Sequence, residues 1–341
     1  MSCSINRHNY SSLLPKKRVD YLKENNYQYV TMPFISVIVP IYNIKEYLEK
    51  CLISLQTQTM HDIEIILIDD GSTDGSGVIC DVFAESDSRF RVIHKSNAGL
   101  AAARNDGVKL AKADYIMFVD GDDWVEKDFC ELPYSIAMEY RIDLVVFQYL
   151  IHCNNKERRR RLFPRKGIIT KEKLLTRYWS YASSVVWNKL YKKSLFDEVA
   201  FPVGHLAEDG AVTHNVVHRA EEIYLLNEYL YHYNKDFRSD SITGTRSKQY
   251  IEDSFAYGNE RINDLEKWGY DCSDEEKRLA LLYLIVYGRY EEKSSYYSSI
   301  LQNSYYFPRN ASLKHKVLFW IYRISPKHFD LISVFFGLRV R

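Results

Sequence analysis

The chain has 341 residues, of which 46% are apolar and 27% are charged, and its formal net charge is +1 at pH 7. This composition is typical of a globular protein and excludes a disordered, collagen-like or coiled-coil chain. The nearly balanced charge excludes a polycation directed at nucleic acid, and there is no run of about 18 apolar residues that would predict a membrane span.

The length suggests one large domain or two ordinary ones. Lys16, Lys17 and Arg18 near the N-terminus are not followed by an apolar segment, so we expect no secretory signal. The cysteines are scattered and form no CxxC pair: Cys3, Cys51, Cys80, Cys130, Cys153 and Cys272. We therefore expect reduced thiols and a cytoplasmic protein, rather than a disulfide framework or a zinc site.

Residues 1–33 are polar and mixed in charge, and we interpret them as an N-terminal extension. The run from Ile35 to Pro40 is apolar and β-branched, which predicts a buried strand. From Lys45 to Thr57 the apolar residues recur at helical spacing, which predicts a helix.

The same alternation of strand and helix continues along the chain. The predicted elements are a strand over Glu64–Asp69, a turn over Gly71–Ser76, a helix over Gly77–Ser86, a strand over Arg91–His94, a helix over Ala101–Ala111 and a strand over Tyr115–Asp120. Near-continuous apolar strands that alternate with helices are typical of an α/β fold, in which helices cover both faces of a mostly parallel sheet.

The pattern is more mixed from Leu144 onward. Leu144–Ile151 predicts a strand, and we expect the basic run Lys156–Arg161 to be a solvated loop, with binding of phosphate or anionic lipid as the alternative. Helices are predicted over Lys248–Trp268, over Glu275–Tyr297 and from Ser312 to the end. These patterns suggest a catalytic domain at 34–245 and a helical C-terminal region at 246–341.

Acidic residues end two of the predicted strands. Asp69 and Asp70 end one of them, and Asp120, Asp122 and Asp123 end another. Parallel sheets bind ligands at the carboxyl ends of their strands, so we expect both clusters to face one pocket. Carboxylates suit a hard cation such as Mg²⁺ or Mn²⁺. The alternative is that Asp and Gly simply end the strands.

Three other nucleotide or metal motifs are excluded. There is no GxxxxGK[ST] phosphate loop and no GxGxxG fingerprint. The segment from Asp70 to Asp81 resembles a calcium loop, but a strand precedes it where a calcium loop needs a helix. Acidic residues with a metal ion are the remaining way to hold a diphosphate.

Four motifs, in their family order, resemble the family 2 glycosyltransferases, which have the GT-A fold and are mostly inverting. The motifs are Pro40–Asn43, Asp69–Ser76, Asn97–Gly99 with Ala103–Asn105, and Asp120–Asp123. The resemblance is highly specific over residues 34–124 and weaker over 125–245. It implies a nucleotide-sugar donor, with a UDP-sugar expected, and a surface glycan as acceptor, either lipid-linked or protein-linked.

The resemblance also implies roles for single residues. Pro40 and Tyr42 would line the base pocket, and Asp70 would bond the base. Arg104 would lie near the base or the diphosphate. Asp120 would face the ribose and the metal ion, which Asp122 would ligate. In a second group of motifs, Glu208 and Asp209 resemble the pair that supplies the catalytic base, Trp187–Tyr191 resembles a segment that often precedes it, and Arg238 would contact the diphosphate.

The chemistry also fits these residue types. A divalent ion stabilises the charge that develops on a diphosphate leaving group. A carboxylate on the opposite face takes the proton of the acceptor hydroxyl, which contributes roughly 10²–10⁴-fold to the rate. Asp209 is the expected base, with Glu208 as its rival. Two other functions stay open: a nucleotidyltransferase that makes nucleotide sugars, and a nucleotide-sugar-binding subunit without catalysis.

The last segment, 312–341, is basic and rich in aromatic residues. Between Lys314 and Arg341 it carries six Lys or Arg residues and one acid, Asp330, and Pro326 divides it into two predicted helices. Basic amphipathic helices lie at the surface of anionic membranes. We therefore expect peripheral attachment to the inner face of the cell membrane, with packing on the catalytic domain as the alternative.

Overall fold

The structure is a computed structural model that describes residues 32–179, 184–235, 247–287, 300 and 313–324. The described residues from Pro33 on form one compact unit. The predicted N-terminal extension lies outside the described residues except for its last two positions, and Arg238 also lies outside them. A domain boundary near residue 245 stays a prediction.

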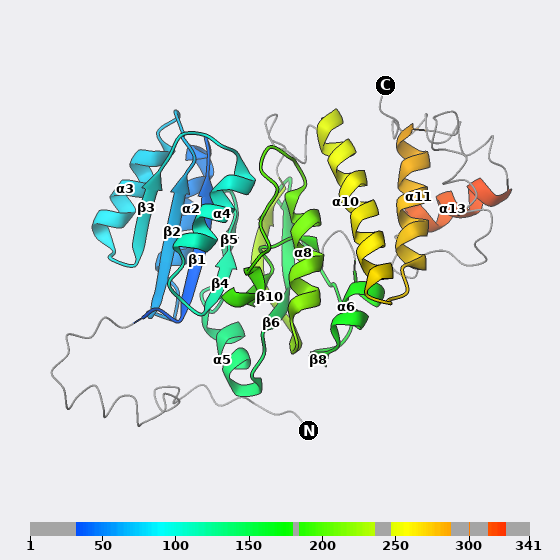
Figure 1. The fold of residues 1–341 in the computed structure, drawn as a ribbon. Helices are drawn as coiled ribbons and strands as arrows, with labels where there is room; N and C mark the ends of the chain where they lie inside the picture. Colours follow the sequence, from blue (N-terminus) through cyan, green and yellow to red (C-terminus); the bar gives the residue numbers. More distant parts are fainter. Residues whose placement is uncertain (1–31, 180–183, 236–246, 288–299, 301–312, 325–341) are drawn as a thin grey trace. The chain divides into compact units, whose positions relative to one another are not determined.

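A ten-stranded sheet forms the centre of the described part of this unit (Figure 1). Its strand order is β3-β2-β1-β4-β9-β6-β10-β5, with β7 beside β6 and β8 beside β10. The strands are β1 (Ile35–Ile41), β2 (Ile63–Asp69), β3 (Phe90–His94), β4 (Tyr115–Phe118), β5 (Trp124–Val125), β6 (Leu144–Cys153), β7 (Lys156–Arg160), β8 (Gly167–Ile169), β9 (Lys189–Lys192) and β10 (Ile223–Asn234).

Strand direction brings the important strand ends to one edge. β1 pairs in parallel with β2 and β4, and β2 pairs in parallel with β3. β9 is antiparallel to both β4 and β6, and β6 is parallel to β10. The carboxyl ends of β1, β2, β3, β4, β6 and β10 therefore lie at the same edge, and the prediction of a mostly parallel α/β sheet is confirmed.

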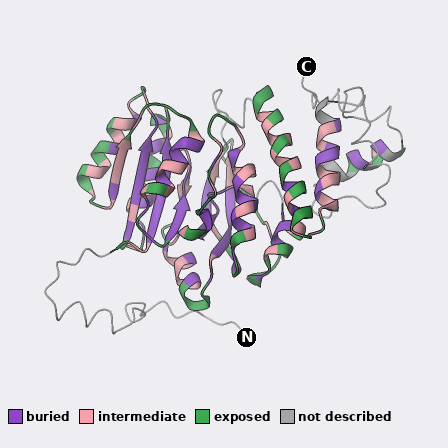
Figure 2. Ribbon diagram, viewed as in Figure 1, coloured by how far each residue is buried: buried purple, intermediate pink, exposed green. Residues whose placement is uncertain are grey.

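Helices pack on both faces of the sheet because side chains alternate along each buried strand. On one face Val37 of β1 belongs to a core with Leu48, and on the other Ile38 belongs to a core with Ala103 and Val216. Figure 2 shows the strands as the most completely buried part of the sheet unit. The α-helices are α2 (Lys45–Gln56), α3 (Ser76–Ser86), α4 (Leu100–Leu110), α5 (Glu131–Tyr140), α6 (Lys171–Arg177), α8 (Glu208–Arg219), α10 (Lys248–Lys267), α11 (Ser273–Tyr287) and α13 (Leu313–Ile324).

The C-terminal helices are joined to the sheet unit through α8. His214 of α8 lies 2.9 Å from a carboxylate oxygen of Asp264 on α10. Arg261 of α10 forms a buried ion pair with Glu275 of α11, at 2.5 Å. The helix that begins with Glu208 is therefore held from the sheet side and from the C-terminal side.

The described part of the 312–341 segment is helix α13, and much of its apolar face packs on α11. Leu318, Phe319 and Tyr322 are buried in a cluster with Leu281 and Leu284. The side chains of Val317, Trp320 and Ile324 remain exposed. None of the described helices combines the length and the apolar character that a membrane crossing requires.

Two sequence expectations differ from the structure. β4 ends at Phe118 rather than at Asp120, because Asp123 donates its N–H to the Asp120 carbonyl (3.0 Å) and so closes a turn. The basic run 156–161 was expected to be a solvated loop, but most of it forms the edge strand β7. Asn154 and Asn155 both have positive φ (51° and 57°), which a tight two-residue hairpin requires and which asparagine tolerates.

Candidate active site

The carboxyl end of β2 holds the loop that leads into α4. The buried carboxylate of Asp70 accepts hydrogen bonds from the backbone N–H groups of Ala98 (3.0 Å) and Gly99 (2.7 Å). Gly71 has φ +78°, and a Cβ there would lie 2.9 Å from the backbone nitrogen of Asn97. Only glycine fits this close approach without strain, so the two residues fix the start of α4 at the edge of the sheet.

The turns after β1 and β2 are tied to each other. The backbone N–H of Asn43 donates to Ser72 Oγ (3.1 Å), and Asn43 Oδ1 accepts from the N–H of Thr73 (2.8 Å). Pro40 is buried in β1, whereas Tyr42 just beyond the strand is 49% exposed. The exposed ring of Tyr42 thus lies at the same edge of the sheet as Asp70, as a base pocket would require.

The loop after β4 is anchored by Tyr231 of β10. The Tyr231 hydroxyl donates to the buried carboxylate of Asp123 (2.6 Å) and accepts from the N–H of Asp120 (3.1 Å). Asp123 also accepts from the N–H of Asn234 (2.7 Å). Asp123 therefore faces β10, and its role is to fix the acidic loop on the sheet.

Asp120 and Asp122 are the acids of this loop whose chemistry fits a cation. The Asp120 side chain is 24% exposed and Asp122 is half-buried. Arg104 contacts one of the two carboxylate oxygens of Asp120. Oxygen ligands of this kind suit Mg²⁺ or Mn²⁺, which keep further positions for phosphate oxygens and water, so the donor set fits the implied metal ion.

Arg104 joins three carboxylates from two distant parts of the chain. Its buried guanidinium lies 2.8 Å from Asp120 through Nη2, and 2.5 Å from Glu208 and 2.6 Å from Asp209 through Nη1. Burial alone would lower the pKa of Arg104, but the three carboxylates outweigh it and raise that pKa. The acids of the β4 loop and of α8 therefore belong to one charge cluster.

Asp209 has the environment of a general base. It lies in the first turn of α8, where Arg104 contacts Oδ1 and the N–H of Val186 donates to Oδ2 (3.2 Å). Burial raises the pKa of Asp209 to about 7, with Glu208 and Asp120 adding to the rise and Arg104 opposing it. A base whose pKa lies near the operating pH is the most effective one.

Sequence reasoning gave no role to Lys189, which the structure places beside this cluster. Lys189 is buried, and its Nζ donates to the carbonyl of Val185 (2.5 Å) and to Asn188 Oδ1 (2.6 Å). Burial lowers the pKa of Lys189 to about 7, opposed by the charge of Asp209. Lys189 thus holds the turn whose Val186 N–H reaches Asp209. The resemblance pointed to this segment, but no sequence pattern indicates a buried lysine.

The predicted site residues form two neighbouring groups. Arg104, Asp120, Glu208 and Asp209 are in direct contact, whereas Pro40, Tyr42 and Asp70 lie at the ends of β1 and β2. Gly99, which Asp70 holds, immediately precedes the helix that carries Arg104. The roles assigned to these residues and to Arg238 stay predictions.

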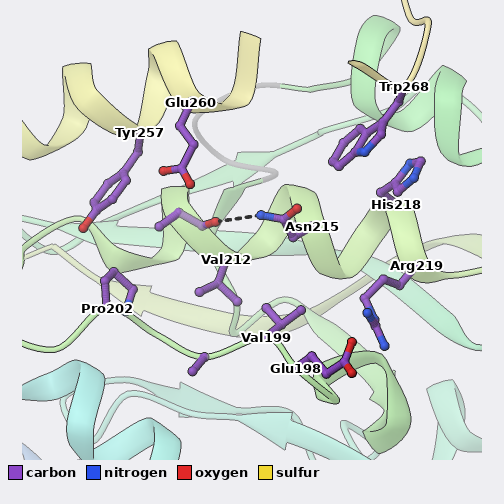
Figure 3. Close-up of a pocket in the computed structure, with 12 residues that line it drawn as sticks. Glu198, Val199, Pro202, Val212, Asn215, His218, Arg219, Tyr257, Glu260 and Trp268 are labelled. Carbon is purple, nitrogen blue, oxygen red and sulfur yellow. Dashed lines mark hydrogen bonds between the residues drawn. The ribbon is translucent and has the colours of Figure 1, made fainter. Parts of the chain in front are cut away.

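A cavity of about 470 Å³ lies beside α8, outside the acidic cluster (Figure 3). Val199 and Val212 form an apolar floor, Tyr257 stands near one end and the stacked rings of His218 and Trp268 near the other. The Tyr257 hydroxyl is buried and has no hydrogen-bond partner within the described part of the chain. None of the predicted site acids lines this cavity.

The chain matches the sequence model of the family described as "Glycosyl transferase family 2" over residues 36–200. It is 37% identical over 251 residues to glycosyltransferase GlyG of Streptococcus pneumoniae, a match that covers 70% of this chain and 83% of GlyG. It is also 37% identical over 257 residues to glycosyltransferase GlyA of the same organism. That second match covers 72% of this chain but only 36% of GlyA.

The fold is similar to that of S. aureus TarS 1-349, solved in complex with UDP-GlcNAc. The TM-score is 0.62 at 18% identity, and the superposition covers 88% of each chain. Similarity at this level of identity concerns the fold alone.

Proposed function

The chain belongs to the family 2 glycosyltransferases, and we propose that it moves a sugar from a UDP-sugar to a hydroxyl group of a surface glycan, with inversion at the anomeric carbon and with the help of Mn²⁺ or Mg²⁺. The observation that carries this proposal is the contact of one guanidinium, that of Arg104, with both Asp120 and Asp209. The contact supports a single centre in which a metal-binding loop and a general base work on the same substrate pair.

The donor would bind at the ends of β1, β2 and β4. The exposed ring of Tyr42 and the carboxylate of Asp70 would hold the base, and Asp120 and Asp122 would hold the ion. The complex of TarS with UDP-GlcNAc supports a uridine nucleotide, because that protein shares the fold. When bound, the ion would neutralise charge on the departing diphosphate.

Asp209 is the proposed base, for two reasons. Its side chain is 20% exposed, whereas that of its rival Glu208 is 5% exposed, so an acceptor hydroxyl would reach Asp209 more easily. Arg104 and the Val186 N–H fix the orientation of the Asp209 carboxylate. Asp209 would take the proton of the hydroxyl as its oxygen attacks the anomeric carbon, and one displacement of this kind inverts that carbon.

Substitution of Asp209 and Asp122 tests this proposal by separating catalysis from donor binding. Asp209→Asn should lower turnover by about 10²–10⁴-fold, the contribution of a general base, while UDP binding is kept. Asp122→Ala should abolish both turnover and the metal-dependent part of UDP binding. Release of UDP, GDP or TDP from the corresponding sugars gives turnover, and calorimetry with and without Mn²⁺ gives binding.

The matched control is Asp197→Asn, which removes an exposed acid away from the charge cluster and should leave both measurements unchanged. Near-normal turnover of Asp209→Asn would reassign the base. If no sugar nucleotide binds with the help of the metal ion, the donor assignment is wrong, and a triphosphate substrate would instead indicate a nucleotidyltransferase.

Attachment to the membrane surface belongs to the same proposal, since a lipid-linked acceptor would lie there. The exposed Val317, Trp320 and Ile324 recur at helical spacing on α13, in a segment rich in Lys and Arg, which supports it. Trp320→Glu combined with Ile324→Glu should reduce flotation with phosphatidylglycerol vesicles. Unchanged flotation would favour a helix that only packs on α11.

A further inference from the structure

The edge strand β7 concentrates positive charge that the proposed reaction does not use. All five of its side chains, from Lys156 to Arg160, are exposed, and Arg161 follows directly. The six positions 156–161 hold five cations and one acid, although the formal net charge of the whole chain is only +1. Within the described residues, none of these five cations forms an ion pair with a carboxylate.

The register with β6 sorts these cations onto two faces, since opposite residues of an antiparallel pair share a face. Arg160 lies opposite Tyr149, Arg158 opposite Ile151 and Lys156 opposite Cys153. Lys156, Arg158 and Arg160 therefore form a row on one face, with neighbours about 7 Å apart along the strand.

The other face of β7 is already engaged. The guanidinium of Arg159 lies 5.5 Å from the centre of the Tyr229 ring. Arg161 donates to the carbonyl oxygens of Phe163 (3.3 Å) and Pro164 (2.6 Å). The row on the first face is therefore the part of β7 that is available to a ligand.

This row lies close to the proposed base. Tyr149, opposite Arg160, packs edge-on against Trp187, with ring centres 4.7 Å apart. Trp187 directly follows Val186, whose N–H donates to Asp209. The β6–β7 turn also lies at the carboxyl edge of the sheet, where Asp120 follows β4. Two aromatic side chains thus separate the cation row from the acceptor side of the site.

Protection of a sheet edge explains some charge on β7 but not its composition. Isolated lysines are enough to prevent edge-to-edge pairing. Three cations on one face, two of them arginines, instead suit phosphate groups, because a guanidinium can donate two parallel hydrogen bonds to phosphate oxygens. An interfacial membrane anchor would also need an apolar face, which β7 does not present.

We propose that Lys156, Arg158 and Arg160 form a binding surface for phosphate groups of the acceptor, so that the acceptor is a phosphate-bearing glycan or polyol. This inference rests on the proposed function, because it takes Asp209 as the point where the acceptor hydroxyl reacts. The row would hold the anionic chain on one side while its hydroxyl lies at Asp209.

Binding of a fluorescent glycerol phosphate oligomer to the full chain tests the surface. Wild-type protein should bind it, and the row variant Lys156→Gln/Arg158→Gln/Arg160→Gln should bind it about tenfold more weakly or worse. Wild-type binding should weaken with added salt more steeply than that of the variant. The charge-matched control Lys109→Gln/Lys112→Gln/Lys127→Gln removes three exposed lysines elsewhere and should bind within about twofold of wild type.

Further measurements keep the outcomes distinct. A neutral oligosaccharide should bind the wild type and the row variant equally. UDP binding, measured for every protein, shows that each is folded; its absence from wild type would contradict the proposed function and not the phosphate surface. Equal loss in the row and control variants would overturn the inference. So would binding of phosphatidylglycerol vesicles, but not of the oligomer, through the row.

Discussion

Asp209 takes its acid–base behaviour from groups on three segments of the chain. Its own helix buries it, Arg104 of α4 contacts one oxygen, and the Val186 N–H contacts the other. The carboxylate form is the one that can accept a proton. A pKa of about 7 therefore leaves Asp209 partly protonated at neutral pH.

The pH dependence of kcat/KM follows from this pKa. The value should be constant above about pH 8 and fall about tenfold per pH unit below about pH 6, because protonation removes the base. The same raised pKa makes the folded state bind this proton more tightly than the unfolded chain does, so its contribution to stability is lost as the pH rises through about 7.

Steady-state rates between pH 5 and 9, with UDP binding measured over the same range as a control, check this prediction. A profile that stays flat down to about pH 5 would mean that the base has the ordinary pKa of an aspartate.

At this scale the sequence identified the acids but not their partners. Asp120 and Asp122 were predictable because they follow an apolar strand that ends in a turn. The ion pair of Arg104 with Glu208 joins residues 104 positions apart, and no local pattern encodes such a contact. Asp123 was quoted within the same motif, but only the coordinates show that Tyr231 turns it toward β10.

At the scale of elements, the first half of the fold was predictable because each strand is an apolar run and each helix has a 3.6-residue period. The prediction weakened after residue 125, where β5 and β9 are short and β7 is entirely charged. A charged edge strand has no alternation of apolar and polar residues, so periodicity cannot reveal it. The paired asparagines at 154 and 155 were the one available signal of the hairpin.

The fit of α4 on β1 depends on a helical glycine. A Cβ at Gly107 would lie 2.3 Å from Cγ2 of Ile38, a buried side chain that has little room to move. Gly107→Ala should lower the free energy of unfolding by about 1–2 kcal/mol, because overpacking outweighs the gain of about 1 kcal/mol in helix propensity.

Urea unfolding measures this effect. Gly210→Ala is the matched control in α8, where the nearest atom to an added Cβ would be 3.8 Å away, and it should be neutral or stabilising. Equal effects of the two substitutions would mean that the predicted close contact does not decide the outcome.

At the scale of the molecule, the C-terminal helices reach the catalytic centre through buried charges. Glu275 of α11 lies between Arg261 of α10 and Arg278, and α10 in turn holds α8. Burial alone would raise the pKa of Glu275, but Arg278 and Arg261 outweigh it and lower that pKa to about 2. Sequence periodicity predicted these helices but not the buried ion pairs that join them.

Glu275→Gln should lower the free energy of unfolding by about 3–5 kcal/mol, because it leaves buried guanidinium groups without their counter-charge. The lowered pKa also means that the contribution of Glu275 is present above about pH 4.5 and is lost as the pH falls toward 2. Glu221→Gln removes one partner of an exposed ion pair and should change stability little. Similar denaturation midpoints for the two variants would contradict this prediction.

The three carboxylates around Arg104 share one counter-charge, and this has a consequence for protein engineering. Replacing any one of them changes the electrostatic surroundings of the other two, so the effects of single substitutions should not add up in combined variants. A library that aims to alter donor or acceptor choice should therefore vary positions 104, 120, 208 and 209 jointly. Screening them one at a time would discard combinations that work only together.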